Sequence, residues 1–258
     1  MSRAADPPNH FIEVSDCSQV RVHHLEATAP NNSPNTDGMN FYGGEDQSIV
    51  DSVITNGDDC ISVVPTGDPA TALCVNQPEQ CHGGNMVVHN VTCRGGHGLS
   101  IGSVRHGDVI NGTFISCVLT REEHSTQAVY SSGGLRIKSY PNGTGTISGI
   151  TYKDIVIKDV AYPLQLQARY CPGGKSSCPS GKTSIQLEGI IFENITGSGE
   201  HAIVGTFDCD PIAPCRGIVL KWVEPRWSQG RLGLPAKFEC ESVHGSADAA
   251  TKPHSCFT

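Results

Sequence analysis

Short runs of valine, isoleucine and threonine recur along this chain, and each run is bounded by glycine, asparagine or aspartate. Seven such runs begin at positions 20, 48, 86, 112, 150, 185 and 217, so successive starts are 26 to 38 residues apart. Repeats in this range are typical of solenoid proteins. Each run is too short for a helix, and its β-branched residues favour a strand. This repeated unit restricts the possible folds more than any other feature.

A second set of short apolar runs lies between the members of the first set, beginning at positions 60, 99, 135, 164 and 202. Two or three strands per repeat, with no helix between them, predict one coil of a parallel β-helix. A single coil cannot bury its own apolar side, so neighbouring coils must stack at about 4.8 Å per step. An antiparallel sandwich is the alternative for short strands, but the recurring strand–bend–strand unit favours the β-helix. We therefore predict one all-β domain over residues 1–258.

The composition agrees with this fold and excludes several classes of function. The 258 residues include 29 glycines and 16 prolines, and only 17% are charged, which is typical of a turn-rich β protein. A net charge of -8 without any basic run gives no support for nucleic-acid binding. No apolar stretch approaches the roughly 18 residues needed to cross a bilayer. We expect a monomer that binds neither nucleic acid nor a membrane.

The cysteine content indicates an oxidising compartment, because 12 cysteines are many for a cytosolic chain. Asn-X-Ser/Thr sequons, which accept N-linked glycans, support the same location. The N-terminus has no apolar secretory signal, so we expect a secreted protein whose front part lies outside this sequence. The five sequon asparagines are Asn31, Asn90, Asn111, Asn142 and Asn194.

Proximity in the sequence predicts four disulfides, one of which would tie down a C-terminal tail over about residues 239–258. Cys17 and Cys117 have no near partner and are expected to be buried thiols. A zinc site is not predicted, because no CxxC pair or His/Cys cluster at ligand spacing occurs. The expected pairs are Cys74–Cys81, Cys171–Cys178, Cys209–Cys215 and Cys240–Cys256.

Four short polar motifs fall at separations of about one coil. They are Asn35-Thr-Asp-Gly, Gly57-Asp-Asp, Gly96-His-Gly and Arg136-Ile-Lys. Asp37 and Asp58 are 21 residues apart, while Asp59 and His97 are 38 apart and His97 and Arg136 are 39 apart. The two longer separations each contain an insertion. Stacked coils would place the motifs on successive rungs of one face over about 15 Å, with acids at one end and cations at the other.

In this order, NTDG, NGDDC, GGHGLSIGS and RIK resemble the signature of glycoside hydrolase family 28, the polygalacturonases. The motifs cover residues 35–138, and the repeat pattern extends the similarity along the chain. The resemblance implies a right-handed parallel β-helix that lacks its N-terminal coils, since family members carry more residues before the first motif. It also implies inverting hydrolysis of the α-1,4 bonds between galacturonic acid units of pectin, without a metal or organic cofactor.

The resemblance also implies roles for individual residues. Asp58 would protonate the glycosidic oxygen, and Asp37 with Asp59 would activate the hydrolytic water. His97 would hold the acid in its working orientation and protonation state. The implied substrate-binding residues are Asn35, which would help to shape the acidic cluster, Arg136 and Lys138, which would grip a galacturonate carboxylate, and Tyr170.

Glycoside hydrolysis needs these residue types. One carboxyl must be protonated and another ionised, at a separation of about 6.5–9.5 Å in an inverting enzyme. Crowding of like charges raises the pKa of one carboxyl and keeps it protonated. Residues i and i+2 of a strand share a face, so Arg136 and Lys138 would both face the groove while Ile137 points inward. If Lys138 only grips substrate, its replacement would raise KM more than it lowers kcat.

Several alternatives remain open at this point. Asp37 beside a glycine is also a common turn residue, and an Asp-Asp pair could bind calcium, although the regular ligand spacing is absent. The resemblance slightly favours exo over endo action, because family members that act on chain ends often carry an aromatic residue and a proline after RIK, as Ser139-Tyr140-Pro141 does here. Insertions around residues 74–81 and 118–135 would agree with this if they close one end of the groove. Xylogalacturonan and rhamnogalacturonan are alternative substrates. The rival classes are a truncated pectin-binding protein without activity and a structural β-helical adhesin.

Overall fold

The structure, a computed structural model, describes residues 2–65, 81–121, 132–172, 181–228 and 235–258. Every regular element assigned in these ranges is a strand, which confirms the all-β prediction. The strands are β1 (Ser2–Ala5), β2 (Ile12–Ser15), β3 (Arg21–His23), β4 (Leu25–Thr28), β5 (Met39–Tyr42), β6 (Gln47–Asn56), β7 (Asp59–Val64), β8 (His82–Gly95), β9 (Gly98–His106), β10 (Asp108–Ile115), β11 (Val118–Thr120), β12 (Gly133–Thr144), β13 (Thr146–Val160), β14 (Tyr162–Gln167), β15 (Gln186–Gly199), β16 (Ile203–Asp208), β17 (Cys215–Trp227), β18 (Lys237–Glu241) and β19 (Val243–Ala247).

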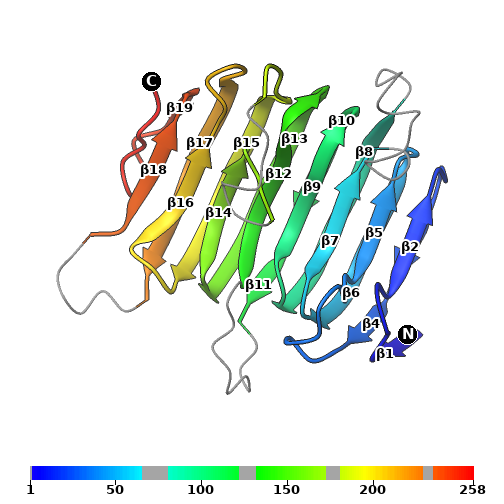
Figure 1. The fold of residues 1–258 in the computed structure, drawn as a ribbon. Helices are drawn as coiled ribbons and strands as arrows, with labels where there is room; N and C mark the ends of the chain where they lie inside the picture. Colours follow the sequence, from blue (N-terminus) through cyan, green and yellow to red (C-terminus); the bar gives the residue numbers. More distant parts are fainter. Residues whose placement is uncertain (1, 66–80, 122–131, 173–180, 229–234) are drawn as a thin grey trace.

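The strands form two sheets that run the length of the molecule (Figure 1). The larger sheet has the order β1-β4-β6-β8-β10-β13-β15-β17-β19, with β3 beside β6 and β11 between β8 and β13. The smaller sheet has the order β18-β16-β14-β12-β9-β7-β5-β2. Every pairing between these strands is parallel. The fold is the predicted right-handed parallel β-helix, and the sandwich alternative is wrong.

Each coil adds its strands to the sheets and covers the apolar side of the coil before it. In the smaller sheet, Met39 pairs with Ile61, Ile61 with Leu99, Leu99 with Leu135, and Leu135 with Leu164. All five side chains are buried, although each comes from a different coil. The core is therefore built from columns of equivalent positions, which is why one repeat cannot fold alone.

Two corners of the coil are marked by ladders of residues with positive φ. Asparagine and aspartate tolerate this left-handed conformation better than most residues. Their side chains also bond along the stack, since Asn90 donates to Asp51 at 2.6 Å and Asn194 donates to Asp154 at 2.7 Å. One ladder contains His24, Asp51, Asn90, Ser116, Asp154, Asn194 and Trp222, and the other contains Gln19, Asp46, Asn85, Asn111, Gly149, Gly189 and Gly217.

Aromatic rings stack along the interior. Phe114, Tyr152 and Phe192 are register partners in three successive coils, with ring centroids 4.7 Å and 5.3 Å apart. Phe207 continues this cluster and contacts Phe257 edge-on at 5.0 Å. The C-terminal residues thus cover the last coil with a ring rather than leaving its core exposed.

Two of the predicted disulfides, Cys209–Cys215 and Cys240–Cys256, are confirmed. Cys81 and Cys171 are disulfide-bonded, but their expected partners Cys74 and Cys178 lie outside the described residues. As predicted, Cys17 and Cys117 are free, although only Cys117 is buried. The predicted tail over residues 239–258 contains a regular strand, β19, so the irregular part begins after Ala247.

Cys60 and Cys93 form a disulfide that the sequence analysis did not identify. Cys60 lies on β7 and Cys93 on β8, so the bond joins the two sheets across the core directly behind the acidic motif. Their separation of 33 residues gave no sign of proximity.

The described ranges contain no helix whose length and hydrophobicity would allow it to span a membrane.

Candidate active site

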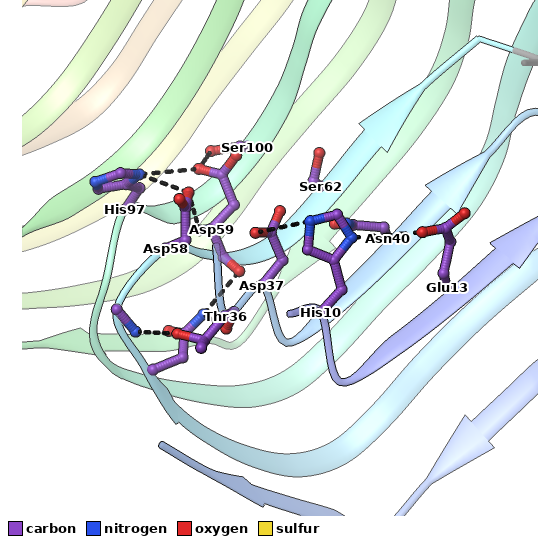
Figure 2. A network of polar contacts seen from close by, with 12 residues as sticks. His10, Glu13, Thr36, Asp37, Asn40, Asp58, Asp59, Ser62, His97 and Ser100 are labelled. Atoms are coloured by element: carbon purple, nitrogen blue, oxygen red, sulfur yellow. Dashed lines mark hydrogen bonds and ion pairs between the residues drawn. The ribbon is translucent and has the colours of Figure 1, made fainter. Parts of the chain in front are cut away.

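The coil register brings the acidic and histidine motifs together at the N-terminal ends of the neighbouring strands β5, β7 and β9 of the smaller sheet (Figure 2). The Gly38 amide donates to the Asp59 carbonyl at 2.9 Å, and the His97 amide donates to the Asp58 carbonyl at 2.8 Å. Asp37 directly precedes Gly38, so all three acids and His97 belong to three stacked turns. The predicted placement of these motifs on successive rungs is confirmed.

Glycines make this close stacking possible. A Cβ atom at Gly38 would lie 2.5 Å from the Cys60 carbonyl oxygen, and one at Gly96 would lie 2.2 Å from the Asp58 carbonyl oxygen. Gly96 also has a φ of +57°, which larger residues rarely adopt. The glycines beside the acids therefore allow neighbouring turns to approach within hydrogen-bonding distance.

Asp59 is the most firmly held of the three acids. One of its oxygens accepts a hydrogen bond from the Ser100 hydroxyl at 2.6 Å, and the other accepts one from the Lys138 ammonium at 2.6 Å. The side chains of Asp59 and Lys138 are only 5% and 6% exposed. A buried carboxylate needs such compensation, because desolvation of an unpaired charge is costly.

The position of Lys138 corrects one prediction. The sequence analysis placed acids at one end of the groove and cations at the other. Lys138 instead forms a buried ion pair with Asp59, so it is part of the acidic cluster. Ile137 is buried as predicted, and Arg136 lies beside Gln167, to which its Nε donates at 3.0 Å.

Asp58 is paired with His97. The Nδ1 atom of His97 lies 2.8 Å from an Asp58 oxygen and 3.9 Å from Asp59, and both the His97 and the Asp58 side chains remain partly open to solvent. The same Asp58 oxygen accepts the backbone N–H of Asp59. Burial raises the pKa of Asp58, but the hydrogen bond and charge of His97, with smaller contributions from the Asp59 amide and Lys138, outweigh it and lower the pKa to about 2.

Asp37 has the opposite electrostatic character. Burial, followed by the negative charges of Asp59 and Asp58, raises its pKa to about 6, while His10 and Asn40 act in the other direction. The predicted rise in the pKa of one carboxyl is thus found at Asp37, where burial is the largest single cause. Asp58, the implied proton donor, has a lowered pKa in the free protein because His97 stabilises its carboxylate.

The raised pKa of Asp37 predicts a pH-dependent stability difference. Between pH 4 and pH 6 the folded chain holds a proton on Asp37 that the unfolded chain has released, so wild type loses stability as the pH rises through this window. Asp37→Asn removes the buried charge. The free energy of unfolding of this variant should nearly equal that of wild type at pH 4 and exceed it by up to about 3 kcal/mol at pH 7. Denaturant unfolding at each pH measures the difference.

Asp6→Asn is the matched control, because Asp6 is exposed and also has a positive φ that asparagine accepts. Its stability relative to wild type should stay constant over the same range. If the Asp37→Asn difference also stays constant, the carboxyl of Asp37 is not destabilised by burial in the folded state.

Tyr170 is found next to the cationic motif. Its ring centroid lies 5.2 Å from the Arg136 guanidinium carbon and 5.6 Å from the Lys138 ammonium. Tyr140 contacts Tyr170 edge-on at 5.8 Å, and the Arg105 guanidinium lies 4.5 Å from the Tyr140 centroid. A strip of two adjoining aromatic rings with cations at both ends thus extends from the acidic cluster.

Asn35 does not shape the acidic cluster as expected. It is exposed with a φ of +54°, and its side chain forms no hydrogen bond within the described ranges. Asn56 has that function instead, because its buried amide donates to the carbonyls of Thr36 and Asp59, each at 2.8 Å. The Thr36 hydroxyl also accepts the amide of Gly57 at 2.9 Å, so it helps to join the two acidic turns.

The sequence analysis missed Thr36, Asn56 and Ser100 as supporting residues of the site. Thr36 and Asn56 stand within the NTDG and NGDDC motifs, and Ser100 stands in the GGHGLSIGS motif, so membership of the motifs was the available signal. It also missed His10 and Asn40, which lie near Asp37 in Figure 2, and Glu13, which lies on the far side of His10. No motif drew attention to these three.

The cluster is better suited to acid–base chemistry than to metal binding. Asp58, Asp59 and His97 each offer a ligand atom, and these atoms lie within 4.8 Å of one another. A cation there would have to displace the Lys138 ammonium or break the contact between Asp58 and His97. The buried positive charge of Lys138 would also repel it.

Comparison with known proteins gives consistent matches. A family model described as "Glycosyl hydrolases family 28" matches residues 3–256. Polygalacturonase QRT2 of Arabidopsis thaliana is 32% identical over 213 residues, covering 83% of this chain and 44% of that protein. Polygalacturonase-2 of Solanum lycopersicum is 29% identical over 243 residues, covering 94% and 48%. A polygalacturonase structure from Erwinia carotovora superimposes with a TM-score of 0.68 at 19% identity, covering 95% and 55%. The chain spans about half the length of the curated relatives it matches.

Proposed function

Because this chain belongs to glycosyl hydrolases family 28, we propose that it hydrolyses the α-1,4 bonds between galacturonic acid units of pectin with inversion at the anomeric carbon. The observation that carries the proposal is the gathering of Asp37, Asp58 and Asp59 around one solvent-facing edge, with His97 and Lys138 in contact with them. Two different electrostatic environments within one group of carboxylates are what glycoside hydrolysis requires.

In this mechanism Asp58 is the general acid. The free protein holds Asp58 as a carboxylate against His97. The proposed step starts from the imidazolium form of His97, whose Nδ1 hydrogen lies in this 2.8 Å contact. Transfer of that proton to Asp58 leaves a neutral imidazole and a carboxylic acid. The acid then protonates the glycosidic oxygen as the bond to the anomeric carbon breaks. Displacement of water and arrival of an anionic sugar both raise the pKa of Asp58 and favour this transfer.

Asp37 and Asp59 activate the hydrolytic water. Asp59 is held as a carboxylate by Lys138 and Ser100, and it provides a fixed hydrogen-bond acceptor. Asp37 takes the proton of the attacking water once its own proton has been lost. Water then adds to the anomeric carbon from the side opposite the departing sugar, which gives inversion.

The cation–aromatic strip would bind the substrate. Arg136 has a planar guanidinium suited to a galacturonate carboxylate, and Tyr170 offers a ring on which a sugar can pack. Local binding of this kind is needed because the chain and the polymer are both negatively charged. Asn35 is exposed at the mouth of the acidic turns, where it could contact the polymer. No cofactor takes part in these steps.

We further propose that the protein is secreted and acts as a monomer on extracellular pectin. The disulfides support an oxidising compartment. Names of the relatives, which are polygalacturonases of plants and bacteria, agree with a galacturonan substrate. Xylogalacturonan and rhamnogalacturonan hydrolysis, and binding of pectin without cleavage, are the alternatives.

Exo action is the more specific form of the proposal. Its support is the resemblance of Ser139-Tyr140-Pro141, which follows RIK, to family members that act on chain ends. Most of the insertion around residues 74–81 and most of that around 118–135 lie outside the described residues, so they add no support.

The function is tested by incubating the protein with polygalacturonate and following reducing ends, product length and viscosity together. We expect reducing ends to appear with monomer present from the first time points and with little loss of viscosity. A rapid viscosity drop with longer products would establish endo action. Binding to the polymer without any release of reducing ends would reject the hydrolase proposal. Xylogalacturonan and rhamnogalacturonan, assayed in parallel, should be cut more slowly.

A further inference from the structure

His10 lies against Asp37 from the N-terminal segment that leads into β2 (Figure 2). Its Nε2 atom is 3.6 Å from an Asp37 oxygen. On the other side of the ring, Nδ1 is 2.8 Å from the amide nitrogen of Asn40 and 3.4 Å from a Glu13 carboxylate oxygen. The imidazole therefore bridges a buried acid of the site and a more exposed acid on the neighbouring strand.

The contacts define the protonation of the ring in two states. An amide nitrogen can only donate, so Nδ1 accepts from Asn40 and the ring hydrogen is on Nε2, directed at Asp37. In the second state Nδ1 is also protonated, and Glu13 is placed to accept its hydrogen. The Asn40 amide nitrogen then no longer donates to Nδ1. Its hydrogen bond to Asp37, which favours the ionised carboxyl, is not altered by this step.

We propose that His10 is a positioning residue for Asp37, which directs an N–H at the carboxylate and, when charged and balanced by Glu13, favours its ionised form. The acidic cluster is then served by two imidazoles, His97 for Asp58 and His10 for Asp37. The reaction consequence of this proposal rests on the proposed function. The effect on Asp37 itself does not.

The charges around His10 support this direction. Asp37, Glu13 and the neutral Asn40 face the ring, and Asp58 and Asp59 act on Asp37 from the far side. Both of those acids disfavour ionisation of Asp37, whereas His10 favours it. Removing His10 therefore leaves Asp37 with burial and two like charges, and its carboxyl should release its proton only at higher pH.

The test compares His10→Gln and His10→Lys with wild type. In His10→Gln, the carboxyl titration of Asp37, followed by carbon-13 NMR and assigned with Asp37→Asn, should move up by about one pH unit, which corresponds to about tenfold in the ionisation constant. His10→Lys keeps a positive charge and should restore most of the shift. The acidic limb of the kcat/KM profile should move up with the titration in His10→Gln, with KM changed less than twofold.

His23→Gln is the matched control, since His23 is an exposed histidine on β3, at the same end of the solenoid. Among the described residues, its ring contacts only the ring of His24. It should leave both the titration and the profile unchanged. The proposal is overturned if His10→Gln titrates like wild type, or if glutamine and lysine at this position shift Asp37 equally. If wild type cuts no galacturonan while the NMR shift is present, the proposed function fails and the role of His10 stands.

Discussion

Asp58→Asn is expected to lower the release of reducing ends from polygalacturonate by a factor of about 10³ or more, because a general acid typically contributes about 10²–10⁴-fold. The asparagine amide can still occupy the same space beside His97, but it has no proton to give to the glycosidic oxygen. Circular dichroism and denaturant unfolding should show that the variant is folded. Asp6→Asn, the same exchange at an exposed site, should keep full activity.

An activated substrate separates the acid from the base. An aryl α-galacturonide whose leaving group departs without protonation should be cut by Asp58→Asn with a much smaller loss than polygalacturonate. Asp37→Asn should be impaired equally on both substrates, because water still has to be activated. The reverse pattern would identify Asp37, whose pKa is already raised to about 6, as the proton donor. Near-normal turnover of polygalacturonate by Asp58→Asn would reject the role of Asp58 altogether.

Lys138→Met is expected to cause the largest loss of stability of any change near the site. It leaves the Asp59 carboxylate buried without its charged partner, and breaking a buried ion pair in this way typically costs about 3–5 kcal/mol. The free energy of unfolding in urea measures this loss. Adding Asp59→Asn to the same chain should recover most of it, since no unpaired charge then remains.

Lys237→Met provides the matched control. Lys237 and Glu239 form an ion pair of the same length, 2.6 Å, on β18 of the same sheet, but their side chains are 58% and 46% exposed. Its loss should cost no more than about 1 kcal/mol. Equal losses for the two lysine variants would show that the Lys138–Asp59 pair is not effectively buried.

The contact with Asp59 also changes the kinetic expectation for Lys138. A lysine that only gripped substrate would affect KM, as the sequence alone suggested. Since Lys138 fixes an acid of the reaction, its replacement should lower kcat at least as much as it raises KM. Arg136→Met, in contrast, should act mainly on KM, because the Arg136 side chain contacts Gln167 and the Tyr170 ring rather than an acid.

The sequence was sufficient for the architecture because the architecture is periodic. A column such as Ile61, Leu99 and Leu135 repeats the same chemical environment in each coil, and the repeat is visible as recurring β-branched runs. The same periodicity placed the NTDG, NGDDC and GGHG turns next to one another. Short-range disulfides such as Cys209–Cys215 were also predictable, because few residues separate their ends.

The burial of individual side chains and the identity of their contact partners could not be predicted from the sequence. Lys138 and Asp59 are 79 residues apart, and nothing in RIK states that its lysine is buried against an acid while its arginine is not. The link between Cys60 and Cys93 depends on two side chains pointing into the same coil interior.

Spacing along the chain was therefore enough to predict a stacked β-solenoid in which three aspartates and a histidine come together. The three-dimensional structure was needed to show which aspartate has the raised pKa, which one is paired with lysine, and that His10 lies beside Asp37. Ionisation depends on burial and on charges a few ångströms away, and those neighbours come from different coils of the chain.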